Sequence, residues 1–259
     1  MRNRLLLLAK VFAATVATPS LAADMVLKAP PPSATYNWAG GYVGGNVGYG
    51  WGRDTGGLWD STTDPNFAQY FALGGNALPG VKPRGLIGGV QIGYNWQVSP
   101  LWVAGLVADV QLSGLRASDV GQSGPPAVNA VIIQTNDARI NFFGTVRGKV
   151  GVANNNWLLY GTAGLAYGQV RSEMTASCVS APCTGAFWQG SASPFRAGWA
   201  GGAGIEIGVT PNVRVGVEYL HIDLGTITTT TSEVSGVSFS ADSKFAADVI
   251  RATVNVKFR

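Results

Sequence analysis

The amino-acid sequence predicts an all-β fold: an antiparallel, up-and-down transmembrane β-barrel of eight strands that follows a cleavable signal peptide. Three observations lead to this prediction. Eight segments alternate hydrophobic with small or polar residues, the connections between them alternate short and long, and aromatic residues gather near the segment ends. After the N-terminal region, no stretch reaches the roughly 18 consecutive hydrophobic residues that indicate a transmembrane helix.

The composition excludes both a disordered chain and an ordinary soluble domain. The chain has 36 glycines in 259 residues, about twice the average share of ~7%, and only 12% charged residues where about 25% is typical. Disorder requires low hydrophobicity and high net charge, whereas 46% of these residues are hydrophobic and the mean hydropathy is +0.18. A large hydrophobic surface must therefore be buried or immersed in lipid.

The N-terminus is typical of a secretory signal peptide. Arg2 and Arg4 form a positive start, a largely hydrophobic stretch follows, and small residues precede Asp24. Residues 1–23 are therefore the predicted signal peptide, with cleavage after Ala22 or Ala23. The alternative, a membrane anchor, is less favoured because the stretch is shorter than the ~20 residues of a spanning helix.

Cleavage of the signal peptide also changes the net charge of the chain, and with it the partners that the charge predicts. Removing Arg2, Arg4 and Lys10 lowers the formal net charge from +4 to about +1. The mature chain keeps no cluster of lysine and arginine, so no nucleic-acid partner is expected. Residues 24–37 include three consecutive prolines and read as a periplasmic linker. The barrel domain is then predicted over 38–259.

The first four predicted strands pair a hydrophobic face with a polar or glycine-rich one. In 42–51 and 86–97, valine, isoleucine and aromatic residues alternate with glycine, asparagine and glutamine. In 102–112 the polar face carries an aspartate and a glutamine. In 145–152 valines lie opposite a threonine, an arginine and a lysine. This period of two is the pattern of a strand with two unlike faces.

The last four predicted strands follow the same rule with one exception. The segment 157–170 is hydrophobic on both faces, so its pattern does not assign an inner side. In 199–209 hydrophobic residues alternate with small ones and a glutamate, and in 213–219 with an arginine and a glutamate. The segment 250–258 alternates most regularly, with an arginine, a threonine, an asparagine and a lysine on one face.

The connections distinguish a membrane barrel from a soluble β-sandwich. Three are tight turns, at 98–100, 154–156 and 210–212. Four are long, at 52–84, 113–140, 171–194 and 224–244, and are rich in Gly, Ser, Thr or Pro. This strict alternation is expected of an outer-membrane barrel with short periplasmic turns and long extracellular loops. It places both termini in the periplasm and the protein in the cell outer membrane.

Aromatic residues fall into two predicted girdles, where amphipathic rings prefer the two membrane interfaces. The periplasmic girdle comprises Tyr94, Trp96, Trp102, Trp157, Tyr160 and Phe258. The outer girdle comprises Tyr49, Trp51, Phe142, Phe195, Trp199 and Tyr219. The alternative is that they are ordinary core aromatics.

Several of these stretches resemble the porin-like outer-membrane β-barrel surface antigens of alphaproteobacteria, which are small OmpA-like eight-stranded barrels. The similar runs are WAGGYVGGNVGYGW from Trp38, GVQIGYNWQ from Gly89, GTVRGKVG from Gly144, GLAYG from Gly164 and VEYL from Val217. The resemblance covers nearly the whole mature chain. It implies recognition by the barrel-assembly machinery through a terminal aromatic residue.

The chain departs from this family at two positions. Val107 stands where such proteins often carry an inward acidic residue, and Phe258 is followed by Arg259 rather than ending the chain. The first departure puts one interior ion pair in doubt, and the second the efficiency of recognition by the assembly machinery.

The polar faces predict a charge network inside the barrel. Its members are Asp109, Arg147, Lys149, Glu206, Arg214, Glu218, Arg251 and Lys257. Eight strands enclose a lumen just wide enough to be filled by side chains, and charges buried there must be paired or hydrated. The narrow lumen favours an interior packed with side chains. The alternative is a conduit with a weak preference for anions, because cations outnumber anions in the network.

Catalysis, cofactors and metals are not expected. The only histidine, His221, lies at a strand end beside Glu218 and Asp223, without the further signals of a hydrolase. Cys178 and Cys183 lack a nearby histidine or further cysteine for a tetrahedral metal site. Export into an oxidising compartment predicts instead that they form a local disulfide.

Two functions remain from the sequence. The first is a structural and surface-exposed role in the outer membrane, with lipid and lipopolysaccharide as partners. The alternative is a porin-like channel for small solutes. The sequence does not predict an oligomeric state.

Overall fold

The computed structural model describes residues 36–54, 59–61, 81–123, 131–181, 184–232 and 239–258. Two compact units are distinguished, Met1–Ala34 and Thr35–Arg259, and all described residues belong to the second. The predicted signal peptide, and the linker as far as residue 35, lie outside the described residues. The described part contains no helix long and hydrophobic enough to cross a membrane.

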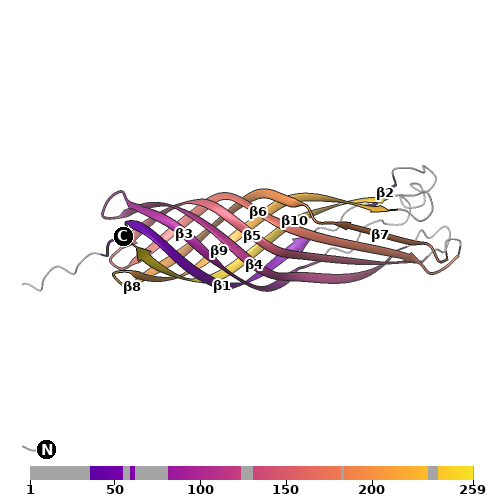
Figure 1. Ribbon diagram of the computed structural model, residues 1–259, viewed down its shortest axis with the longest axis horizontal. Helices are drawn as coiled ribbons and strands as arrows, with labels where there is room; N and C mark the ends of the chain where they lie inside the picture. Colours follow the sequence, from indigo (N-terminus) through magenta and orange to yellow (C-terminus); the bar gives the residue numbers. More distant parts are fainter. Residues whose placement is uncertain are drawn as a thin grey trace, which may run out of the picture. The chain divides into compact units, whose positions relative to one another are not determined.

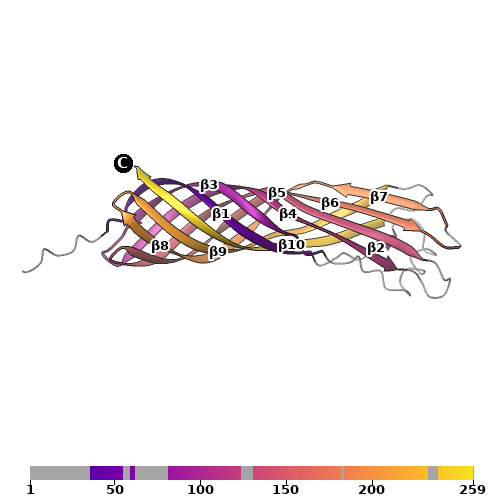
Figure 2. The same ribbon diagram turned by 90° about the horizontal axis from the view of Figure 1, so that it is seen from below.

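Eight long antiparallel strands form a closed ring, as predicted (Figure 1 and Figure 2). They are β1 (Gly40–Asp54), β3 (Arg84–Gln97), β4 (Trp102–Ser123), β5 (Ile132–Asn154), β6 (Trp157–Cys178), β8 (Phe195–Thr210), β9 (Val213–Ser232) and β10 (Phe239–Phe258). Closure comes from β1, which pairs with both β3 and β10. A closed ring leaves no unpaired edge, the condition for a sheet to span lipid.

Two short strands extend the ring at the end away from the start of β1 and the end of β10; the end where β1 starts and β10 ends is called the terminal end (Figure 1). β2 (Trp59–Ser61) pairs with β10. β7 (Phe187–Ala192) pairs with β6 and, through two residues, with β9. At the other end, Gly41 of β1 lies opposite Phe258 of β10, so the beginning and the end of the barrel chain meet.

The predicted tight turns are confirmed, but the predicted long loops are too long. β5 and β6 connect through Asn155, whose φ of 53° is one that asparagine tolerates better than most residues. In contrast, β4 continues to Ser123 and β5 begins at Ile132, so most of the expected loop 113–140 is strand. The same holds for 171–194 and 224–244. Hydrogen bonding between strands continues there after the hydrophobic pattern has ended.

The hydrophobic face of the strands points outward. Val43, Val90 and Val254 are 49%, 58% and 51% exposed, whereas Arg147 and Arg251 are each 1% exposed. The inner side of β6, which the sequence left open, carries Leu158, Tyr160 and Thr162; its outer side includes Leu159 and Leu165. The barrel thus turns hydrophobic side chains outward and buries Arg147 and Arg251 inside.

The interior is filled in three layers. Nearest the start of β1 and the end of β10 is a hydrophobic cluster of Trp38, Val103, Ala153, Leu158 and Tyr160. A charged and polar layer follows. Beyond it lies a larger hydrophobic cluster that includes Leu115, Phe143, Val170, Leu220 and Phe245. The sequence did not predict these hydrophobic layers, which lie on both sides of the charged layer.

Candidate functional site

Four charged residues from four strands meet across the centre of the lumen. Arg147 Nη2 and Arg251 Nη2 each lie 2.9 Å from Asp109 Oδ2. Arg147 Nη1 lies 2.9 Å from Glu218 Oε1, and Arg251 Nη2 lies 2.6 Å from Glu218 Oε2. Their side chains are between 0% and 4% exposed. We call these four residues the central cluster; two of its ion pairs, Arg147 with Glu218 and Arg251 with Asp109, cross the lumen between strands that are not neighbours in the ring.

Neutral hydroxyl groups complete the central cluster. Thr145 Oγ1 donates a hydrogen bond of 2.8 Å to Asp109 Oδ2 and accepts one of 2.8 Å from Arg147 Nε. Tyr160 Oη donates to Glu218 Oε1 over 3.2 Å. Tight hydrogen bonding of this kind is what makes buried ion pairs tolerable, because their desolvation is costly.

Tyr160 corrects the predicted periplasmic girdle. It is only 5% exposed and points into the lumen, whereas the girdle prediction required an outward ring. Pairing in the sheet explains the error: Tyr160 lies opposite Gly151, and Thr162 opposite Lys149, an inward residue. The segment is hydrophobic on both faces, so only its neighbours decide which face turns inward.

A second charged group lies between the central cluster and the terminal end of the barrel. Lys149 Nζ lies 2.8 Å from Glu206 Oε1, and Arg214 Nη1 lies 3.5 Å from Glu206 Oε2. The Lys149 ammonium lies 4.5 Å from the ring centre of Tyr160. The Arg214 guanidinium lies 4.4 Å from that of Tyr42 and is 5.7 Å from that of Trp38. Cation–π contacts help to hold these buried cations.

Residues just before β1 close the terminal end. Trp38 is fully buried, and its backbone N–H donates to Gln97 Oε1 over 3.0 Å. The ring of Tyr36 lies 4.7 Å from that of Trp38 and against Gly208, where any Cβ would clash with it. Burial raises the pKa of the Tyr36 phenol, against the opposing charge of Arg214. Tyr36, which belongs to the predicted linker, thus packs against the barrel.

Lys257 does not join the buried charges with which it was grouped. It is half-buried, and its Nζ donates to the backbone carbonyl of Asn37 over 3.2 Å. As the last inward position of β10, it lies at the rim of the barrel. The other seven members of the predicted network are buried within it.

Sequence reasoning missed a row of buried amides beside the charges. Asn46 Nδ2 donates to Gln91 Oε1 over 3.3 Å, and Gln91 Nε2 donates to Asn255 Oδ1 over 2.7 Å. The three residues come from β1, β3 and β10, which are adjacent in the ring. Their signal in the sequence was an amide on the face opposite the hydrophobic residues of each strand.

Nine aromatic residues of the two predicted girdles point outward and are between 36% and 53% exposed. Near the termini these are Tyr94, Trp96, Trp102, Trp157 and Phe258, and near the other end they are Tyr49, Trp51, Trp199 and Tyr219. Phe195 is also exposed there, and Phe142 is half-buried.

His221 lies on the outer surface within a small polar group. Its Nδ1 is 2.8 Å from Asp248 Oδ1, which also accepts a hydrogen bond of 2.6 Å from Tyr219 Oη. Its predicted neighbours point elsewhere: Glu218 into the lumen, and Asp223 to Lys244 Nζ at 3.1 Å. In the described part of the chain, no hydroxyl or thiol nucleophile is hydrogen-bonded to His221.

The expected disulfide is described at one of its two cysteines. Cys178, the last residue of β6, is disulfide-bonded. Cys183 lies outside the described residues, so the pairing with Cys183 stays a prediction.

These features define a class of protein. A closed antiparallel ring with a lipid-compatible exterior, outward aromatic residues near both ends and a network of buried charges inside is an integral outer-membrane β-barrel.

The family follows from comparison with known proteins. Residues 20–258 match the outer membrane protein beta-barrel domain, and the chain belongs to that family. It is 35% identical over 221 residues to the 31 kDa outer-membrane immunogenic protein of Brucella melitensis, covering 82% of this chain and 84% of that protein. It is 28% identical to the 25 kDa outer-membrane immunogenic protein of Brucella abortus, covering 80% and 78%. The protein is thus a member of the alphaproteobacterial outer-membrane surface antigens.

Among solved structures, the chain is similar to the outer membrane protein OprG from Pseudomonas aeruginosa. The sequence identity is 13%, the TM-score is 0.43, and the match covers 86% of this chain and 98% of that one.

Proposed function

We propose that the protein is a closed structural barrel that stabilises the outer membrane and presents the end bearing β2 and β7 outside the cell. The observation that supports this most directly is the central cluster, whose ion pairs cross the lumen between non-neighbouring strands. Buried hydrophobic clusters lie on both sides of it along the barrel. A lumen packed in this way holds the strands together and leaves little room for solutes.

The proposal includes both termini in the periplasm, assembly by the barrel-assembly machinery, and no catalytic role. The alternative porin-like channel with a weak anion preference is supported by one observation. Four cations and three anions are buried in the charged layer, so the interior has an excess positive charge. In the closed barrel, that excess is held by aromatic rings around Arg214 and Lys149.

Conductance tests the choice between the two functions. We expect the purified, folded protein to give no reproducible large open-channel steps in planar lipid bilayers, because the central cluster blocks the lumen. Liposomes containing the protein should swell in small-solute gradients no faster than empty ones. Large steps or fast swelling would contradict the closed barrel and favour the channel. Folding is checked by the slower migration of unfolded protein after boiling in SDS.

Cysteine labelling tests the orientation. Ser118 is exposed on the distal part of β4, and Asn212 is exposed in the turn between β8 and β9 at the terminal end. We expect a membrane-impermeant maleimide to label Ser118→Cys in intact cells and to label Asn212→Cys only after the outer membrane is opened. Wild-type cells report any background from the native cysteines. The reverse pattern would invert the proposed orientation.

A further inference from the structure

Four arginines lie side by side on the outer surface of four consecutive strands. Arg84 of β3 lies opposite Arg116 of β4, Arg116 opposite Arg139 of β5, and Arg139 opposite Arg171 of β6. All four are exposed. Residues directly opposite each other in a sheet have Cβ atoms roughly 4.5–5.5 Å apart. We call these four residues the arginine row.

The row is only partly neutralised by the protein itself. Glu173 Oε1 lies 3.2 Å from Arg139 Nη2 and 2.6 Å from Arg171 Nε. Within the described residues, neither Arg84 nor Arg116 has an acidic partner within 4.0 Å. Like charges opposite each other destabilise a sheet, so an anion bound between these two arginines would stabilise it.

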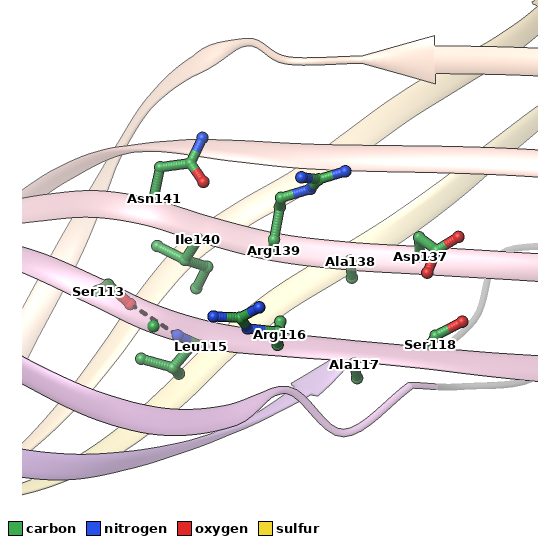
Figure 3. Close-up of a pocket in the computed structure, with 11 residues that line it drawn as sticks. Ser113, Leu115, Arg116, Ala117, Ser118, Asp137, Ala138, Arg139, Ile140 and Asn141 are labelled. Atoms are coloured by element: carbon green, nitrogen blue, oxygen red, sulfur yellow. Dashed lines mark hydrogen bonds between the residues drawn. The ribbon is translucent and has the colours of Figure 1, made fainter.

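Two pockets border the row, and arginines of the row line each of them. The first, of about 510 Å³, lies at the bulges of β4 and β5 and includes Arg116, Arg139 and Asn141. Figure 3 shows Asn141, Arg139 and Asp137 directed to one side of β5 and Ile140 and Ala138 to the other. The exposed arginines therefore occupy the outer side, and the buried hydrophobic residues face the lumen.

The second pocket joins cations to girdle aromatics. It has a volume of about 590 Å³ and is lined by Tyr49, Trp51, Gly52, Lys82 and Arg84. Arg84 lies directly opposite Trp51 in the sheet. A site with two cations beside two amphipathic rings suits an anionic head group at a membrane interface.

The position of the arginine row relative to the lipid-facing surface indicates which anion it meets. Leu86 and Leu112, which lie next to the row on the side toward the chain termini, are 70% and 76% exposed. The outer surface thus changes from leucine to arginine over two residues on β3 and four residues on β4, as expected where lipid acyl chains give way to head groups. A ligand that contacts both surfaces has acyl chains and phosphates.

We propose that the arginine row binds the phosphate groups of lipopolysaccharide in the outer leaflet, while its acyl chains lie on Leu86 and Leu112. Guanidinium groups suit this ligand because they bind phosphate through two parallel hydrogen bonds. This inference rests on the proposed orientation, since only the outward end of the barrel meets lipopolysaccharide. It adds a specific binding surface to the structural role.

Binding of purified lipid A tests the proposal. The folded full-length protein is titrated with diphosphorylated lipid A, the same lipid A with its phosphates removed, and phosphatidylglycerol. The test variant is a double variant that carries both Arg84→Gln and Arg116→Gln. The control is Lys244→Gln, because Lys244 is an exposed cation on β10, outside the arginine row. Because all these side chains are exposed, the variants should fold, which the SDS migration assay checks.

We expect the double variant to bind diphosphorylated lipid A roughly 100-fold more weakly than wild type, since it loses two guanidinium groups that form charge-assisted hydrogen bonds to phosphate. Lys244→Gln should bind like wild type, and removal of the phosphates should weaken binding to wild type by a similar factor. Unchanged binding by the double variant, or equal binding of the dephosphorylated lipid, would overturn the proposal. Equal binding of phosphatidylglycerol would overturn the assignment to lipopolysaccharide.

The labelling experiment separates this inference from the proposed function. If Ser118→Cys is labelled in intact cells and the double variant still binds normally, the orientation stands and the arginine row is rejected. If the labelling pattern is reversed, the orientation fails and the lipopolysaccharide assignment fails with it, whatever the affinity for lipid A.

Discussion

Replacing Glu218 by glutamine should lower the free energy of unfolding of the barrel by about 3–5 kcal/mol, the usual effect of breaking a buried ion pair. The Glu218 carboxylate accepts hydrogen bonds from Arg147 Nη1 at 2.9 Å and from Arg251 Nε at 2.8 Å. Glutamine keeps the shape but not the charge, so two buried guanidinium groups would share Asp109 alone. Urea-dependent unfolding of the protein in phospholipid vesicles measures the change.

The matched control is the exposed ion pair of Lys244 and Asp223. Lys244 Nζ lies 3.1 Å from Asp223 Oδ2, but its side chain is 55% exposed. Lys244→Gln should therefore change the free energy of unfolding by no more than about 1 kcal/mol. If Glu218→Gln had an equally small effect, the central cluster would not be what holds the strands together.

Placing an arginine on the lipid-facing side should destabilise the barrel according to its depth in the membrane. Val254 is 51% exposed on β10, between the girdle residue Phe258 and Ile250, which lies opposite the girdle residues Tyr49 and Tyr219. Val254→Arg should lower the free energy of unfolding in vesicles by about 2–4 kcal/mol, because the charge would enter hydrocarbon. The same urea titration measures it.

Val120→Arg serves as the control for depth. Val120 is 63% exposed on the distal extension of β4, beyond Arg116 of the arginine row. It lies past the membrane interface, so its substitution should have an effect close to zero. Equal effects at the two positions would mean that lipid does not surround the middle of the barrel.

Both predictions depend on the same feature of the membrane-spanning part of the barrel: its outer surface is hydrophobic, and its charged side chains are buried inside. The central cluster stabilises the ring from within, while the lipid-facing valines and the girdles set its depth in the membrane. Glycines on the inner face make room for the buried charges: a Cβ at Gly48 would clash with Arg251 and with the backbone of Ile250. The fold thus accommodates long charged side chains in a narrow lumen.

The number and order of the long strands were predictable from the sequence, and so was the outer face of seven of them. The reason is local: in a strand, successive side chains point to opposite faces, so the pattern of residues shows which face meets lipid. Val254 and Arg251 belong to opposite faces whatever the rest of the chain does. Most members of the interior charge group were predictable for the same reason.

Only the tertiary structure decided the inner face of β6, the extent of the strands beyond the membrane and the partners of each charge. Tyr160 turns inward because pairing with β5 gives it the face shared by Lys149. Arg251 reaches Asp109, 142 residues away in sequence, because closure of the ring brings β10 across the lumen from β4. Neither a residue's neighbours in sequence nor its hydrophobicity specifies such contacts, since they depend on the register and curvature of the whole sheet.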